Sequence, residues 1–268
     1  SGHEADVVKR ALSSGEFDGS VSRALHDLVA RQKREAVKRE SFENLEWLKA
    51  RSVAAEALDH YGRWPEARKL TEPAGVLGQH LPALGARPTR AIVTDEARDV
   101  AREQIRLYLA FIQAHLYRTH RYQLAREAVL RCEEAVRVIR QEPTYPCYGT
   151  LARIAFFLGR IHRQTGGYQQ AEVAFRDAIG FLDRRAGHYL AKHREHPGLV
   201  SAEKRDLEVD SSKYKTAVCL ALGLGWLCYS RGELGRALSY TVPAHVQMID
   251  KTDAINVGYV DLIRGSVF

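Results

Sequence analysis

The stretch LGRIHRQTGGYQQAEVAFRDAI, residues 158–179, decides the fold class that this sequence predicts. Apolar residues recur at helical spacing on both sides of Gly166, which indicates two helices joined by a tight turn. A glycine at that place supplies the backbone freedom that a helix C-cap needs. The small residues Gly159 and Ala171 would allow the two helices to approach closely at their crossing. The side chains expected to fill the space between this hairpin and the next are Tyr168, Phe175 and Ala178.

The order of these residues resembles the tetratricopeptide repeat family. In that family two helices span about 34 residues and carry a Leu-Gly pair, a turn glycine, an aromatic residue and spaced small or aromatic residues. Residues 152–185 match nearly every signature place, with His162 where an aromatic is usual. A second copy is LGWLCYSRGELGRALSYTVPA, residues 224–244, in which Leu234 replaces the usual aromatic. The resemblance implies an array of antiparallel helix hairpins that stack on one another.

Weaker copies extend the pattern in both directions. One has its turn at Gly62, another has His120 where the glycine should be, and a last one begins near Val257 and stops at Phe268. We therefore expect the chain to be part of a longer protein in which the array continues. The turns at 62, 120, 166 and 232 lie 58, 46 and 66 residues apart, more than one standard repeat. The predicted fold is all-α, an irregular tetratricopeptide-like array of antiparallel hairpins, that is, an α-solenoid of the right-handed superhelical kind.

Composition supports a helical chain with three regions. Of its 268 residues 45% are apolar, which is enough for a sizeable core, and strong helix formers dominate. Residues 1–19 are expected to be a flexible segment, and their first three, Ser1-Gly2-His3, resemble the remnant of an expression tag. Residues 20–93 predict N-terminal helical hairpins. Residues 94–268 predict the repeat array, which is cut short at its C-terminal end.

The charge balance favours anionic partners. The net charge is +7 and the isoelectric point is about 9.3. This suits acidic peptides, nucleic acid, nucleotides or a membrane surface, and does not choose among them. The alternative is that the arginines are solvated side chains on the outer faces of the helices and bind no ligand.

The cysteines and the hydropathy pattern indicate a cytoplasmic location. No CxxC pair occurs, and the sequence pattern is typical of buried free thiols rather than disulfides. The four are Cys132, Cys147, Cys219 and Cys228. A disulfide-poor chain without a signal peptide suits the cytosol. The most apolar stretch, residues 218–229, is about half the length that spans a bilayer, so no membrane partner is expected.

The resemblance also implies where a ligand would bind, since the first helix of each hairpin lines the concave groove of such arrays. The implied ligand-binding groove consists of Tyr117, Arg118, Arg153, Phe156, Arg160, Arg163, Trp226 and Tyr229. The corresponding stripe of the first hairpin is mixed in sign and holds Lys49, Ser52, Glu56 and Asp59. Arginine fits carboxylates or phosphates in a bidentate manner, and the aromatics can stack on a peptide side chain or a base. Alternatively, Phe156 and Trp226 belong to the core, and the arginines are solvated or pair with neighbouring acids.

No enzyme signature accompanies this groove. The sequence has no nucleophile elbow, P-loop or zinc-deaminase pattern, and nothing groups its Ser, His and Asp residues. His193 and His196 could share a helix face, but no third or fourth zinc ligand is near in the sequence, and a solvated basic helix end is the simpler interpretation. We expect no catalytic residue, no metal and no cofactor.

Three functions remain open at this point. The first is a non-catalytic scaffold or sensor region of a larger cytosolic protein, which holds an acidic or extended protein segment in the basic groove. The second is binding of RNA or a nucleotide in the same Arg/Tyr-lined groove, which salt would weaken steeply. The third is a regulatory sensor attached to an effector enzyme, as in bacterial signalling or defence proteins that append such repeats.

Overall fold

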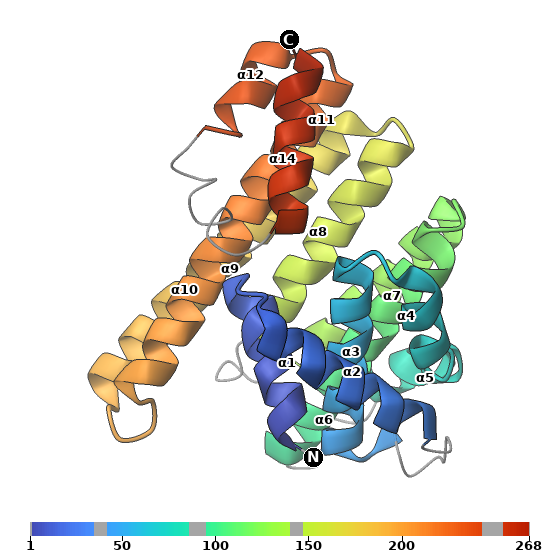
Figure 1. Ribbon diagram of the computed structural model, residues 1–268, viewed down its shortest axis with the longest axis vertical. Coiled ribbons are helices and arrows are strands. Elements are labelled where there is room, and N and C mark those ends of the chain that lie inside the picture. Colours follow the sequence, from blue (N-terminus) through green and yellow to red (C-terminus); the bar gives the residue numbers. More distant parts are fainter. Residues whose placement is uncertain (1, 35–41, 86–94, 140–146, 243–253, 268) are drawn as a thin grey trace. The chain divides into compact units, whose positions relative to one another are not determined.

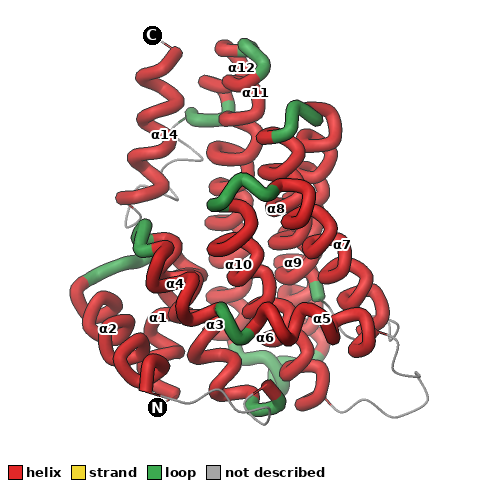
Figure 2. Tube along the Cα trace, turned by 90° about the vertical axis from the view of Figure 1, so that its right-hand side faces the viewer, coloured by secondary structure: helices red, strands yellow, loops and turns green. Residues whose placement is uncertain are grey.

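The computed structural model describes residues 2–34, 42–85, 95–139, 147–242 and 254–267. Every regular element in these ranges is a helix (Figures 1 and 2), which confirms the all-α class. None of these helices is both long and apolar enough to cross a membrane.

The chain divides into two compact units, Ser1–Leu12 with Asp18–Thr150, and Ser13–Phe17 with Leu151–Phe268. The helices that belong wholly or mostly to the first unit are α1 (Gly2–Ser14), α2 (Gly19–Arg34), α3 (Leu45–His60), α4 (Trp64–Thr71), α5 (Ala74–Gly85), α6 (Asp95–Phe111), the π-helix η2 (Ile112–Tyr117) and α7 (Tyr122–Ile139). Those of the second unit are α8 (Tyr148–Gln164), α9 (Tyr168–Glu195), α10 (Ala202–Val218), the π-helix η3 (Cys219–Gly225), α11 (Trp226–Ser230), α12 (Leu234–Ser239) and α14 (Ala254–Val267). The region boundary expected at residues 93 and 94 lies outside the described residues.

Four helix–turn–helix junctions share one geometry. The turn residue has a positive φ in each: Gly62 (73°), His120 (60°), Gly166 (81°) and Gly232 (75°). The N–H of the next residue donates to the carbonyl five residues earlier, in the bonds Arg63 to Leu58 (2.7 Å), Arg121 to Leu116 (3.0 Å), Gly167 to His162 (2.8 Å) and Glu233 to Cys228 (2.9 Å). This hydrogen bond is that of a Schellman C-cap, which has a left-handed residue at its centre. His120 therefore adopts the conformation that glycine has at the other three turns, at the energetic cost of carrying a Cβ there.

The second helix of each hairpin also begins in one way. An alanine stands five residues after each turn residue and is buried; the four are Ala67, Ala125, Ala171 and Ala237. The N–H of each alanine donates to the carbonyl of the residue that follows the turn, at 2.9–3.1 Å. A methyl group is the smallest side chain other than hydrogen, so this position lets the two helices of a hairpin pack closely.

Helix α1 lies within residues 1–19, which the sequence pattern predicted to be flexible. Its buried face consists of Ala5, Val8 and Ala11, three residues apart. Small residues in a polar segment give a weak hydrophobic signal, yet such a stripe is sufficient when tertiary packing stabilises the helix. The structure therefore differs from the expectation at this segment.

The core of the second unit is organised around Phe175. Its ring is fully buried and clusters with Ala171, Leu224 and Leu227, so it joins its own hairpin to the next one, as predicted. A Cβ placed on Gly159 would lie 2.6 Å from the ring. A Cβ on Gly223 of η3 would lie 2.8 Å from the same ring. The phenyl ring thus fits only because α8 and η3 both present a glycine to it.

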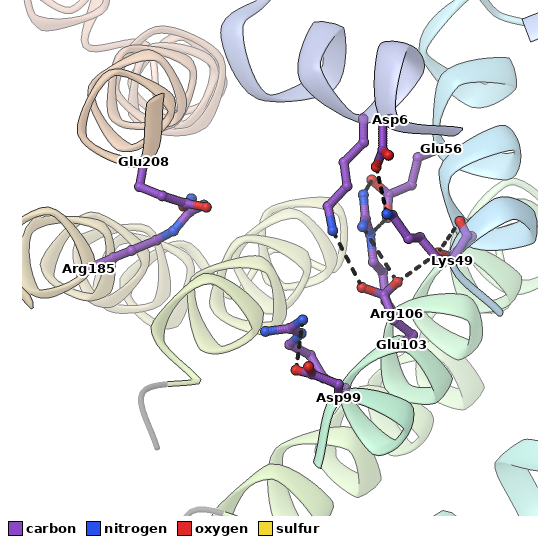
Figure 3. A network of polar contacts seen from close by, with 11 residues as sticks. Asp6, Lys49, Glu56, Asp99, Glu103, Arg106, Arg185 and Glu208 are labelled. Atoms are coloured by element: carbon purple, nitrogen blue, oxygen red, sulfur yellow. Dashed lines mark hydrogen bonds and ion pairs between the residues drawn. The ribbon is translucent and has the colours of Figure 1, made fainter. Parts of the chain in front are cut away.

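Helices α9 and α10 form a long antiparallel pair. Helix α9 has 28 residues, and α10 begins after Ser201, whose hydroxyl accepts the Lys204 N–H at 3.2 Å. Arg185 of α9 pairs with Glu208 of α10 (Figure 3). Residues 197–212 contain the short connection and the first part of α10.

The Phe175 contact predicts a specific coupling. Gly159→Ala should destabilise the fold by about 1–3 kcal/mol, because the added methyl overlaps the buried ring. Phe175→Leu in the same chain should recover at least about 1 kcal/mol of that loss, measured as the coupling in a double-mutant cycle of chemical denaturation. Gly180→Ala is the matched control, since nothing lies within 4 Å of its added Cβ. A Gly159→Ala chain as stable as Gly180→Ala would contradict the packing described.

The turn geometry predicts a second effect. Gly166→Val should lower the melting temperature, because a β-branched residue at φ 81° is strained by about 1–2 kcal/mol. No side chain stands within 4 Å of that position, so a clash would not explain the loss. His120→Gly is the opposite test: it removes a Cβ from a left-handed residue and should not lower the melting temperature. Unchanged stability in Gly166→Val would show that this turn tolerates other geometries.

Candidate functional site

Glycines seven positions apart occur on several helices of the second unit. Gly159 on α8 and Gly225 at the end of η3 are followed at this distance by the turn residues Gly166 and Gly232, whereas Gly180 of α9 and Gly258 of α14 are followed by a glycine inside the same helix. The residues one position after Gly159, Gly225 and Gly258 are Arg160, Trp226 and Tyr259, called here the first row. The residues four positions after them are Arg163, Tyr229 and Leu262, called here the second row. Residues three apart share a helix face, so the two rows of each helix lie together.

Side-chain contacts join α8 to α11 along these rows. The guanidinium carbon of Arg163 lies 5.8 Å from the centroid of the Trp226 ring, within the range of a cation–π interaction. Trp226 in turn meets Tyr229 edge to face at 5.6 Å. Both aromatic side chains are half-buried, as are Arg160 and Arg163. Arg163, Trp226 and Tyr229 therefore form one continuous set of side-chain contacts.

Helix α14 packs beside these aromatic residues. Trp226 and Tyr229 pack against a buried cluster that includes Ile263 of α14. Beside Ile263, the side chains of Tyr259 and Leu262 are 48% and 53% exposed, although both are large and apolar in part. Sequence reasoning did not place these two residues in the groove. Their signal was their offset from Gly258, which equals the offset of Trp226 and Tyr229 from Gly225.

Arg153 and Phe156, also expected in the groove, have contacts on the core side of α8. The Phe156 ring packs at 5.5 Å from the Phe175 ring and belongs to the clusters between the hairpins. The guanidinium of Arg153 lies 5.9 Å from the Phe157 ring centroid. Phe156 therefore has at least a packing role.

Tyr117 and Arg118 belong to the first unit, and their described contacts lie inside it. Tyr117 is buried and meets Tyr122 edge to face at 5.9 Å. Arg118 pairs with Asp59 at 3.1 Å. These contacts explain both residues without a ligand.

The mixed stripe on α3 is engaged in polar contacts (Figure 3). Lys49 pairs with Asp6 of α1 at 2.6 Å, and Ser52 donates to Glu103 of α6 at 3.0 Å. Arg106 of α6 makes a bidentate pair with Glu56, at 2.5 and 2.9 Å. Asp59 accepts hydrogen bonds from Arg118 and Gln113. The positions equivalent to Arg160 and Arg163 are Glu56 and Asp59, which are thus engaged by α6, η2 and Arg118, whereas α1 reaches Lys49.

Glu103 lies at the centre of this network. Burial would raise the pKa of its carboxyl, but the cations Arg106, Lys9 and Arg102 and the Ser52 hydroxyl outweigh burial and hold the pKa below its ordinary value of 4.5. The pKa of Arg106 is raised, because Glu56 and Glu103 outweigh its desolvation. The network is therefore ionised at neutral pH.

The described residues offer little for nucleophilic or metal chemistry. Within them no group of three or more His, Cys, Asp and Glu side chains could hold a metal ion. Burial raises the pKa of Cys219 to about 12, so this thiol stays protonated at neutral pH and is a poor nucleophile. His193 Nδ1 lies 2.6 Å from the Val200 carbonyl, where it closes the loop between α9 and α10.

Comparisons with known proteins give no relative of this chain. No protein-family model matches the chain, and neither the curated proteins nor the solved structures contain a significant match. The function is therefore inferred from the geometry of the two rows and their neighbours.

The ionised network predicts a pH dependence. The pKa of Glu103 is lower in the folded than in the unfolded chain, so its stabilisation is present above about pH 4.5 and is lost as pH falls through the folded pKa. Glu103→Gln should therefore lower the free energy of unfolding by about 1–3 kcal/mol at pH 7. The difference from wild type should shrink as the pH falls through the folded pKa, where the wild-type carboxyl is itself protonated. Asp210→Asn removes an exposed pair with Lys213 and should have almost no effect. A gap between Glu103→Gln and wild type that stays the same throughout acidification would contradict the assignment.

Proposed function

We propose that the second unit binds an extended, acidic peptide segment of a partner protein on the surface formed by the first and second rows. The observation that carries this proposal is the row arrangement itself: Arg160 and Arg163 stand at one end, the half-buried Trp226 and Tyr229 follow, and the exposed Tyr259 and Leu262 continue the surface. Singly exposed apolar residues are normal, but Tyr259 and Leu262 form a pair on one helix face, at the same offsets from a glycine as the half-buried Trp226 and Tyr229, and this favours an interaction surface.

The chemistry of the rows selects the ligand class. Guanidinium groups bind carboxylates through paired N–H donors. The aromatic and leucine side chains gain by covering apolar side chains of a ligand, and Trp, Tyr and Arg are the residues that most often dominate binding energy at interfaces. The ligand is therefore a peptide with a carboxylate near the arginines and apolar side chains towards α14. Its affinity rests on both ends of the surface.

The architecture that we infer for this role is a tetratricopeptide-like α-solenoid with irregular spacing. It is supported by the four matching Schellman turns and by the buried alanine after each. In such an array the rows belong to the groove side. The chain acts as a non-catalytic, cytoplasmic scaffold or sensor region of a larger protein.

The second candidate is RNA or a nucleotide on the same rows. It is favoured by the contact of Arg163 with Trp226, since stacked aromatics beside cations are the usual platform for unpaired bases. The net charge of +7 agrees with it. Against it, Leu262 and Tyr259 extend an apolar surface away from the arginines, where a phosphate backbone would need cations.

The two candidates differ in salt dependence and in which residues matter. We expect a labelled peptide pool that combines acidic and apolar residues to bind the chain with modest salt dependence, and labelled single-stranded RNA to bind weakly. Arg160→Glu and the pair Tyr259→Ser with Leu262→Ser should each weaken peptide binding at least tenfold, about 1.4 kcal/mol, without loss of helicity by circular dichroism.

Lys213→Glu provides the control, because Lys213 is an exposed cation of the same unit that lies off both rows and pairs with Asp210. It makes the same charge change and should leave peptide affinity unaltered. Tight RNA binding that falls steeply with salt and is lost in Arg160→Glu would show that the ligand of this surface is a nucleic acid and not a peptide. Equal losses in Arg160→Glu and Lys213→Glu would show that only net charge is being measured.

A further inference from the structure

Two hairpin turns of the first unit lie side by side. Arg118, next to the second turn, pairs with Asp59, next to the first, at 3.1 Å. The imidazole Nε2 of His115 on η2 lies 3.1 Å from the Arg68 carbonyl oxygen of α4. These contacts bring the ends of both hairpins together on one surface. Residues 59–72 and 113–126 are together called the turn edge.

Two of the three acids on the turn edge are neutralised by close neighbours. Asp59 accepts a hydrogen bond from Arg118, as its ion-pair partner. Glu66 pairs with Arg63 at 2.6 Å and with Lys33 of α2 at 3.2 Å. Their charges are therefore balanced within the chain, and they add little negative potential to the surface around them.

Cations of the turn edge remain in excess of these acids. Arg68 and Lys69 of α4 and Arg121 of the second turn are exposed, and within the residues that the structure describes none of the three has an ion pair. Glu72 is the remaining acid, and it too is exposed without such a pair. Three free cations against one free acid leave a positive surface that attracts an anionic ligand.

An exposed aromatic ring stands beside these cations. Trp64, the first residue of α4, is 40% exposed, and Arg68 follows four positions later, so the two share one face of the helix. Leu124 on α7 is the other large apolar side chain exposed on the turn edge, at 49%. A flat ring next to guanidinium groups is the usual platform for an unpaired base, and an aliphatic side chain can also cover one.

The turn residue His120 adds a second exposed ring at an energetic cost. Its φ is 60°, whereas the equivalent residue is a glycine in the other three hairpins. The hairpin geometry therefore needs no side chain at this place. The His120 ring meets the Tyr122 ring edge to face at 5.6 Å, and its Nδ1 contacts the Tyr122 hydroxyl. Backbone strain that is kept at an exposed residue points to a functional role of its side chain.

We propose that the turn edge of the first unit binds a single-stranded nucleic acid. An unpaired base stacks on Trp64, and backbone phosphates contact Arg68, Lys69 and Arg121, while His120 offers its ring to a neighbouring base. Sequence preference is small, because every base has a face that can stack. Few phosphates are neutralised, so binding is weak, with a Kd of about 10⁻⁵ M at physiological salt. This site does not depend on peptide binding by the second unit.

The test titrates the full chain into labelled oligo(U) and oligo(dT) of about ten nucleotides, by anisotropy over a range of salt concentrations. The slope of log affinity against log salt should be about −2, since each phosphate that a cation neutralises on a single strand contributes about −0.7. Arg121→Gln should make this slope shallower by about 0.7. Trp64→Leu should weaken binding about fivefold at an unchanged slope, whereas Trp64→Phe keeps a ring and should bind nearly as wild type.

Two further variants separate binding from net charge and from folding. Arg23→Gln removes an exposed cation of α2 and should change neither affinity nor slope. Arg23 lies ten residues before Lys33, about 15 Å away along the helix. His120→Gly removes the ring and relieves the backbone, so it should weaken binding about threefold without lowering the melting temperature.

No binding to either oligonucleotide, or binding that Trp64→Leu and Arg121→Gln leave unchanged, overturns the proposal. An equal fall in Arg23→Gln would show that only net charge is measured. A loss confined to Arg160→Glu would place the nucleic acid on the rows of the second unit. Capture of the acidic peptide pool that depends on Trp64, with no oligonucleotide bound, would assign the turn edge to a protein. Peptide binding by the rows is measured with other variants, so the two proposals fail separately.

Discussion

The chain reverses direction between two helices through a single residue with a left-handed backbone, and the rest of each hairpin depends on that residue. The hydrogen bond from the following N–H to the carbonyl five residues back fixes where the first helix ends. It also fixes where the second helix begins, and so which residue faces the partner helix. The turn places the closest approach of the two helices five residues after the turn residue. The alanines at this place are buried in all four hairpins: Ala67, Ala125, Ala171 and Ala237. Even His120 takes φ 60°, which shows that the junction prevails over the preference of the residue.

The turns and the core contact next to them could be predicted from sequence because their causes are local. The residue type of Gly166 and Gly232 indicates a helix C-cap at each position. Phe175 stands at a fixed offset from Gly166. Helix α1 could not be predicted in this way, since Ala5, Val8 and Ala11 give too little hydrophobic contrast and the helix depends on helices distant in the sequence. The candidate site was predictable in part. Arg160, Arg163, Trp226 and Tyr229 follow from the repeat spacing, and so would Tyr259 and Leu262, but whether each is exposed depends on what covers it. The packing of Phe156 against Phe175 and of Tyr117 inside the first unit follows from tertiary neighbours that no spacing reveals.

Equivalent positions carry opposite chemistry in the two units. On α3 they hold Lys49, Ser52, Glu56 and Asp59, and each finds a partner within the first unit. Such a network loses hydration when it is buried, so its net contribution to stability is small, but removing one member leaves another charge unpaired. The network therefore determines which helices pack together but adds little to the free energy of their packing. On α8 and α11 the same positions hold arginines and aromatics that remain half-exposed, which are groups that gain from covering a ligand.

This contrast follows from the constraint at the turns. The left-handed backbone favours glycine at the turns, although His120 shows that another residue is tolerated there. Alanine stands where the helices approach, and Phe175 fits because α8 and η3 each present a glycine to it. The positions six and three residues before the turn residue are not fixed by the turn or by the Phe175 contact. In the first unit they carry Glu56 and Asp59, which pair with Arg106 and Arg118. In the second unit they carry Arg160 and Arg163 on one helix and Trp226 and Tyr229 on another, and the two aromatic residues pack against a buried cluster. The turn therefore leaves the chemistry of these positions to their neighbours in each unit.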